Sequence, residues 1–164
     1  AEFKEAFEVA RQAGLPAALH VAEVDKLEDT QACIDFGAGR LGHALHLSAE
    51  HREALLKGTR PPVEVCPTSN AKTLHLKDLS AHPGLPWLLE NDYPFSLNTD
   101  DSGVFSTTLS QEYHLVAEAF SLSPAKMGQL ALDSLSHAFD KEAAMELRPG
   151  MEVAVAALVQ EASG

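Results

Sequence analysis

Short apolar runs alternate with amphipathic stretches along the chain, and this alternation predicts its secondary structure. Apolar runs of about four to eight residues bounded by turn-forming residues are typical of buried strands. Such runs occur at residues 15–21, 40–47, 62–66 and 95–99. Stretches with a helical period occur at residues 2–13, 25–37, 48–56, 108–120 and 123–139. Strands that alternate with helices predict an α/β fold in which helices cover a parallel sheet.

Capping and turn residues predict where several of these elements begin and end. Ser48 and Ser123 precede helical stretches and are favoured N-caps. Residues 67–70 are predicted to form a turn after the third strand, and the segment that follows is rich in loop-forming residues. Pro149-Gly150 is predicted to interrupt the last helical region, with a short separate helix over 151–158.

Composition narrows the classes of partner. The 164 residues carry 24 acidic and 12 basic side chains, a net charge of −12, which argues against nucleic acid polymers and anionic membrane surfaces. A small nucleotide, which needs only a few local donors, remains compatible. No apolar run approaches the roughly 18 residues of a membrane span. The two cysteines, Cys33 and Cys66, form no CxxC pair, which favours a reducing, cytoplasmic location.

Polar side chains stand at or just past the end of each predicted strand. They are His20, Glu23, His43, Glu64, Asp100 and Asp101. Because the carboxyl ends of parallel strands meet at one edge of a sheet, we expect these side chains to converge. Each has a plain structural alternative: a single strand histidine is commonly a hydrogen-bonded core residue, and Asp-Asp after a strand is commonly a solvated turn. Glu64, between two valines, needs a partner, for which Arg40 and His46 are candidates.

The residue types at these strand ends favour metal-assisted hydrolysis. His20 and Asp100 are nitrogen and oxygen donors suited to Zn²⁺. A second histidine could deprotonate a water, and a nearby carboxyl group could protonate the leaving side of a substrate. A catalytic zinc usually has about three protein ligands. His20 and Asp100 alone are therefore an incomplete ligand set.

Four ordered motifs resemble one known family. They are His20-Val-Ala-Glu23, Arg40-Leu-Gly-His43, Glu64-Val-Cys-Pro-Thr-Ser-Asn70 and Ser96-Leu-Asn-Thr-Asp-Asp101. In order and spacing they resemble the second half of the adenosine/AMP deaminase family. The segment Gly103–Tyr113 is most similar to the adenosine deaminase-like branch, which acts on N6-methyl-AMP and related nucleotides. The resemblance implies the C-terminal half of a (β/α)8 TIM barrel over residues 1–150, followed by a tail over 151–164.

The same resemblance implies a role for each matching residue. His20 and Asp100 would be zinc ligands. Glu23 would carry a proton and deliver it to the purine N1 as water adds to C6. His43 would orient and activate that water, and Asp101 would hydrogen-bond the purine N7. The implied cofactor is Zn²⁺, and the implied partner is a small purine nucleoside or nucleotide.

The chain departs from the family pattern at two places. The family's remaining zinc ligands lie in an HxH motif on the first barrel strand, and this chain contains no HxH. The first residue is also not methionine, so we expect the missing half of the barrel to lie upstream. Ala22 and Ala44 stand where ordinary adenosine deaminases have glycine, and the adenosine deaminase-like branch also lacks the first of these glycines.

Three interpretations follow. In the first, the chain is part of a zinc-dependent aminohydrolase that removes the C6 amino or alkylamino group of a purine. In the second, it is a non-catalytic half-barrel that self-associates, because half a barrel exposes unpaired edge strands and an apolar interior. In the third, it is a fragment with no independent function.

Overall fold

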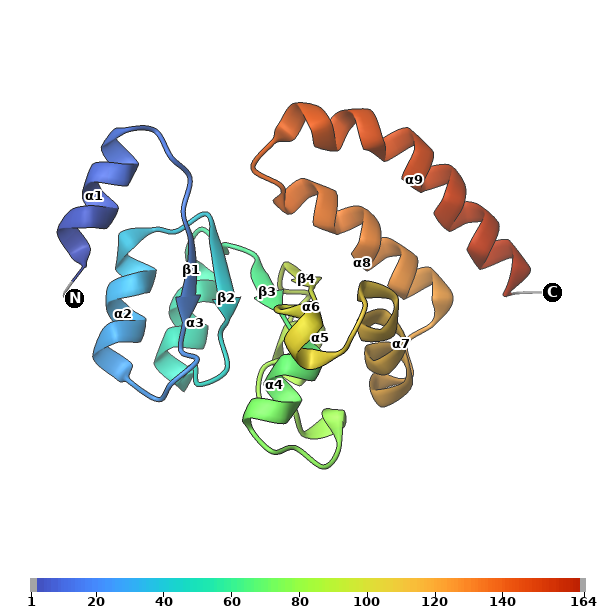
Figure 1. Cartoon of the computed structure of the whole chain (residues 1–164), viewed down its shortest axis with the longest axis horizontal. Helices are drawn as coiled ribbons and strands as arrows, with labels where there is room; N and C mark the ends of the chain where they lie inside the picture. The colour runs from blue at the N-terminus through green and yellow to red at the C-terminus, as the bar shows by residue number, and fades with distance from the viewer. Residues whose placement is uncertain (1–2, 163–164) are drawn as a thin grey trace. The chain divides into compact units, whose positions relative to one another are not determined.

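The computed structural model describes residues 3–162 and shows the expected alternation of strands and helices (Figure 1). The strands are β1 (Ala18–Val21), β2 (Arg40–His43), β3 (Val63–Val65) and β4 (Phe95–Leu97). The α-helices are α1 (Lys4–Gln12), α2 (Leu27–Phe36), α3 (Ala49–Lys57), α4 (Pro67–Thr73), α5 (Leu85–Glu90), α6 (Ser102–Phe105), α7 (Leu109–Phe120), α8 (Pro124–His137) and α9 (Lys141–Glu161). A 3₁₀ turn, η1, spans Leu79–Ala81. Glu2 of the first predicted helix and the last two residues of the predicted tail lie outside the described residues.

The described residues divide into two compact units. The first consists of the residues up to Glu64 together with Pro83–Pro94, and the second consists of Val65–His82 together with the residues from Phe95 onward. The domain boundary expected at residue 150 stays a prediction, and that position lies within α9. Among the described helices, none is both long and apolar enough to cross a membrane.

The sheet has the strand order β1-β2-β3-β4. β1 pairs with β2 in parallel, with Ala18 opposite Arg40 and Val21 opposite His43, and β2 pairs in parallel with β3. The order follows the sequence because each crossover passes through a helix, as expected for successive βα units. The predicted α/β fold with parallel strands is confirmed.

The first unit has an apolar core between its strands and helices. Leu41 and Val63 of the sheet are completely or almost completely buried, as are Leu85 and Leu88 of α5. Tyr93 is also buried, and its hydroxyl donates to the carbonyl oxygen of Pro61 at 3.0 Å. A buried tyrosine with a satisfied hydroxyl fixes the loop before β3 against the core.

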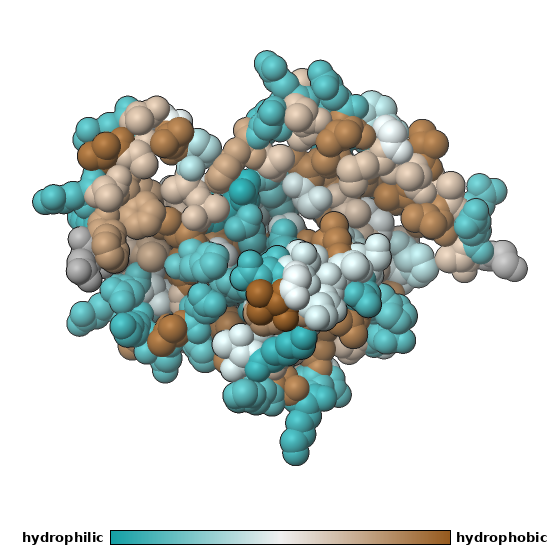
Figure 2. Space-filling view, in the orientation of Figure 1, coloured by the Kyte–Doolittle hydropathy of each residue, from teal (hydrophilic) through white to brown (hydrophobic). Residues whose placement is uncertain are grey.

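The second unit contains α4, η1, β4 and the helices α6 to α9. α8 packs against β4 and against α9, which forms a helical hairpin with it (Figure 1). The contact is close at Gly128, where a Cβ atom would lie 2.4 Å from Cγ1 of Val155. Other apolar side chains of α9 are exposed, and Figure 2 shows apolar residues along this helix. They are Met145, Leu147, Val153 and Leu158.

Two capping predictions are confirmed, and the structure shows a third cap that was not predicted. Ser48 accepts a hydrogen bond from the amide of His51 at the start of α3, and Ser123 caps α8 in the same way. Thr108 begins α7 with a capping box, in which Gln111 reciprocates. Caps are predictable because both partners lie within one helical turn.

Three other local predictions are wrong. The strand over 40–47 ends at His43, because His43 and Ala44 both adopt positive φ angles, which are incompatible with an extended chain. Residues 67–70 begin helix α4 rather than a turn, with Pro67 in the first helical position, where its fixed φ fits. The last helix runs through Pro149 without a break, because proline removes only one helical N–H and the packing of α9 on α8 retains the helix.

Candidate active site

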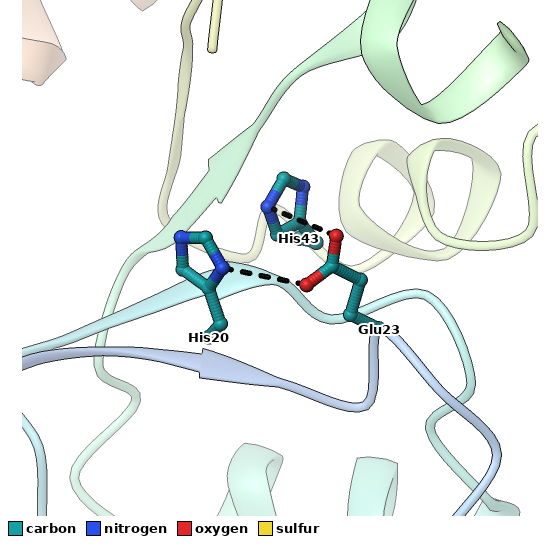
Figure 3. Close-up of side chains that lie close together, drawn as sticks. All are labelled: His20, Glu23 and His43. Atoms are coloured by element: carbon teal, nitrogen blue, oxygen red, sulfur yellow. Dashed lines mark ion pairs between the residues drawn. The ribbon is translucent and has the colours of Figure 1, made fainter. Parts of the chain in front are cut away.

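Three of the predicted site residues converge at the ends of β1 and β2 (Figure 3). The carboxylate of Glu23 lies between two histidines: its Oε2 is 3.3 Å from Nδ1 of His20, and its Oε1 is 3.7 Å from Nε2 of His43. The two imidazole rings are 4.5 Å apart and nearly perpendicular. The His43 side chain is only 2% exposed, whereas that of His20 is 66% exposed, so the cluster has a buried end and an accessible end.

Strand register and a glycine bring this cluster together. His20 is opposite Gly42 in the β1·β2 pair, which places His43 one residue further along, beside the end of β1. A Cβ atom at position 42 would lie 2.7 Å from Cδ2 of His20, closer than side-chain atoms can approach. Only glycine therefore allows the His20 ring to lie over β2 in this way.

The backbone is strained directly after both strands. Ala22, His43 and Ala44 have φ angles of 51°, 61° and 51°, a region that disfavours side chains other than glycine. Strained non-glycine residues cluster at functional sites, where the surrounding structure holds them. A backbone of this kind favours glycine at positions 22 and 44, and this chain accommodates alanine at both.

The cluster has the composition of a cation site. His20, Glu23 and His43 each offer one donor atom, and the three atoms lie within 4.8 Å of one another. Two imidazole nitrogens and a carboxylate oxygen suit Zn²⁺.

An open cavity of about 230 Å³ adjoins His20 and Glu23 and extends to Thr30 and Cys33. Burial raises the pKa of the Cys33 thiol, which therefore stays protonated near neutral pH and is a poor nucleophile.

Glu64 has a structural partner. Nε of Arg40 donates to Oε1 of Glu64 at 2.7 Å, and both side chains are mostly buried. Of the two partners considered for Glu64, the structure shows Arg40. The pair joins β2 to β3 and satisfies a carboxylate that would be costly to bury alone.

Asp100 lies in the second compact unit, just after β4. Ser69 of α4 donates from its hydroxyl to Oδ2 of Asp100 at 2.7 Å. Asp100 has a φ angle of 55°, so it shares the strained backbone of the first cluster. Cys66 offers its sulfur within 4.8 Å of an Asp100 carboxylate oxygen. Asp101 follows as the exposed residue before α6.

A family model described as adenosine deaminase matches residues 1–150. The chain belongs to the adenosine deaminase family. Among curated relatives, an adenosine deaminase of Haemophilus ducreyi is 37% identical over 84% of this chain and 40% of its own length. An N6-methyl-AMP deaminase of Mus musculus is 36% identical over 84% of this chain and 40% of its own length.

Solved structures of this family share the fold. The crystal structure of Arabidopsis ADAL complexed with IMP superposes with a TM-score of 0.84 and 32% identity, over 97% of this chain and 45% of that chain. The 164 residues thus span less than half the length of the relatives they match. Four parallel strands with covering helices are the expected content of half a (β/α)8 barrel, so the predicted fold class is confirmed.

Of the predicted site residues, the structure brings together His20, Glu23 and His43 in the first unit. Asp100 and Asp101 belong to the second unit, and their joining the same site stays a prediction. Ser69, the partner of Asp100, belongs to the third of the four sequence motifs and lies in a segment that was expected to be a turn. One further polar residue was not singled out from sequence. Glu112 is completely buried on α7, one helical turn before the buried Val116, so an acidic residue on an apolar helix face was the available signal.

Proposed function

We propose that this chain is part of a zinc-dependent enzyme that hydrolyses the C6–N bond of a purine nucleoside or its monophosphate. The observation that carries the proposal is the Glu23 carboxylate lying between His20 and His43 at the ends of two parallel strands. A carboxyl group and an imidazole held side by side next to a histidine that can bind a metal suit addition of water followed by loss of an amine.

In the proposed reaction, a C6–O bond forms, an O–H bond of water breaks, and the C6–N bond breaks to release ammonia or an alkylamine. Glu23 holds the proton that is delivered to N1, which makes C6 electrophilic. His43, largely buried, orients the water and accepts its proton. Zinc, when bound, would supply the Lewis acidity that makes water nucleophilic near neutral pH. His20 and Asp100 are the proposed zinc ligands, and Asp101 is the proposed hydrogen-bond donor to N7.

N6-methyl-AMP is the proposed substrate, with adenosine as the second candidate. The relatives named for N6-methyl-AMP deamination and the ADAL complex with IMP support the nucleotide, because loss of methylamine from N6-methyl-AMP yields IMP. The relative named adenosine deaminase supports the nucleoside. A cytoplasmic location is part of the proposal, because Cys33 and Cys66 are not joined in a disulfide.

The test uses the longest reading frame that contains this chain, purified and measured for zinc by elemental analysis. N6-methyl-AMP, AMP and adenosine are offered separately, and the released methylamine or ammonia is quantified. We expect stoichiometric zinc and faster methylamine release from N6-methyl-AMP than ammonia release from adenosine. A zinc-free protein without turnover on any of the three would refute the proposal, and preference for adenosine would refute only the choice of substrate.

A non-catalytic, self-associating half-barrel is the competing proposal. It is favoured by the exposed apolar side chains of α9, because exposed apolar surface favours association (Figure 2). The mass of the 164-residue chain in solution decides it. A stable dimer without zinc or turnover would support self-association, and a monomer would exclude it.

A further inference from the structure

Glu112 is a carboxylate completely buried in the second unit. Burying a carboxylate is costly, and an apolar side chain of similar size would pack against the same helices at lower cost. Both oxygens of Glu112 are engaged by neutral donors. The backbone amide of Thr68 donates to Oε2 at 2.8 Å, and the hydroxyl of Thr107 donates to Oε1.

These two donors lie on either side of Asp100 along the folded chain. Thr68 is adjacent to Ser69, whose hydroxyl donates to Asp100. Thr107 lies after α6, the short helix that begins directly after Asp101, and its own amide donates to the carbonyl of Ser102. A single buried carboxylate therefore holds both the segment that donates to Asp100 and the segment that leads away from it.

The Asp100 turn gains from such support. Its φ angle of 55° lies in the left-handed region, which aspartate adopts more readily than most residues but less readily than glycine, so neighbouring contacts help to hold it there. Ser69 holds the carboxylate of Asp100, but the position of Ser69 depends on the start of α4, which is where Glu112 binds.

We propose that Glu112 is a positioning residue: through Thr68–Ser69 on one side and Thr107 on the other, it fixes the backbone turn and carboxylate of Asp100. The inference rests on the proposed function in one respect, namely that Asp100 binds zinc. Partners outside the ligand set that orient a metal-binding carboxylate typically change metal affinity by about 10- to 100-fold.

The experiment compares three variants of the longest reading frame that contains this chain. Glu112→Leu removes both hydrogen bonds. Glu112→Gln keeps an acceptor for the Thr68 amide and offers an N–H to the Thr107 hydroxyl, which can accept it. Val116→Ala is the matched control, because Val116 is equally buried one turn further along α7 and its side chain has no polar atom that could bind Thr68 or Thr107.

Two readouts are used, and neither depends on turnover. The first is the zinc dissociation constant, measured by competition with a chromophoric chelator. We expect it to rise about 10- to 100-fold in Glu112→Leu, to change much less in Glu112→Gln, and to stay unchanged in Val116→Ala. The second is amide hydrogen exchange, which we expect to accelerate over 66–73 and 98–108 in Glu112→Leu, whereas in Val116→Ala it accelerates only within α7.

The outcomes separate this inference from the proposed function. If the unmodified protein binds zinc and Glu112→Leu binds it equally well, the positioning role is overturned. It is also overturned if Val116→Ala weakens zinc as much as Glu112→Leu does. If the unmodified protein binds no zinc, the proposed function fails, and hydrogen exchange alone decides the role of Glu112: unchanged exchange over 98–108 in both Glu112 variants overturns it. If Glu112→Leu does not fold, Thr107→Val, which removes only the hydroxyl that donates to Oε1 of Glu112, takes its place, and unchanged zinc affinity together with unchanged exchange over 98–108 in that variant overturns the positioning role.

Discussion

The stability of this protein should fall on mild acidification because of one buried histidine. His82 is only 1% exposed, and its Nε2 lies 3.1 Å from Oδ1 of Asn70. Burial lowers the pKa of His82 from 6.5 to about 4. Since Oδ1 of Asn70 accepts this hydrogen bond, the folded protein holds a neutral imidazole with its proton on Nε2.

The sign and size of the effect follow from linkage. Between pH 6.5 and about pH 4 the unfolded chain binds a proton at His82 that the folded chain does not, so the free energy of unfolding decreases as the pH falls through this window. At about 1.4 kcal/mol per pH unit, the difference between the two pKa values corresponds to a loss of about 3 kcal/mol. The stabilisation that comes from keeping His82 neutral in the folded protein is complete above pH 6.5 and is lost by pH 4.

Carboxylates also titrate in this range, so the assay compares variants rather than a single protein. Urea unfolding is measured at several pH values from 4 to 7 for the unmodified chain, His82→Gln and His114→Gln. We expect His82→Gln to be less stable at pH 7 and to lose about 3 kcal/mol less than the unmodified chain on going to pH 4. His114 is exposed on α7, so His114→Gln should follow the unmodified curve closely. Parallel curves for His82→Gln and the unmodified chain would refute the reasoning.

Three further predictions concern the site and the last helix. Glu23→Gln should lower turnover at least about 100-fold, because it removes the proton donor, while zinc content stays the same; loss of zinc would contradict the assigned role. Gly42→Ala should cost about 1–3 kcal/mol in urea unfolding, because its Cβ would displace the His20 ring. Gly103→Ala, with no atom within 4 Å of the new Cβ, is its control, and equal effects would argue against the steric explanation. Pro149→Ala should raise the thermal midpoint through up to about 3 kcal/mol of restored helix stability; an unchanged midpoint would show that α9 is not helical there.

Several features of the protein were determined by its sequence alone, because they depend on residues close together along the chain. The period of apolar residues predicted each strand and most helices, and Ser48, Thr108 and Ser123 begin helices as capping chemistry requires. Likewise, the placement of His20 and His43 at the ends of successive parallel strands followed from the alternation of strands and helices. These predictions succeed because a cap or an amphipathic turn is complete within a few residues.

Other features were decided only by the tertiary structure, because their partners are far apart in sequence. Periodicity could not show that Gly42 makes room for the His20 ring, or that Glu64 pairs with Arg40 rather than His46. Helix propensity predicts a break at Pro149, and the packing of α9 on α8 overrides it. Glu112 is the clearest case: its chemistry depends on an amide 44 positions earlier in the chain, and only the folded chain brings that donor to the buried carboxylate.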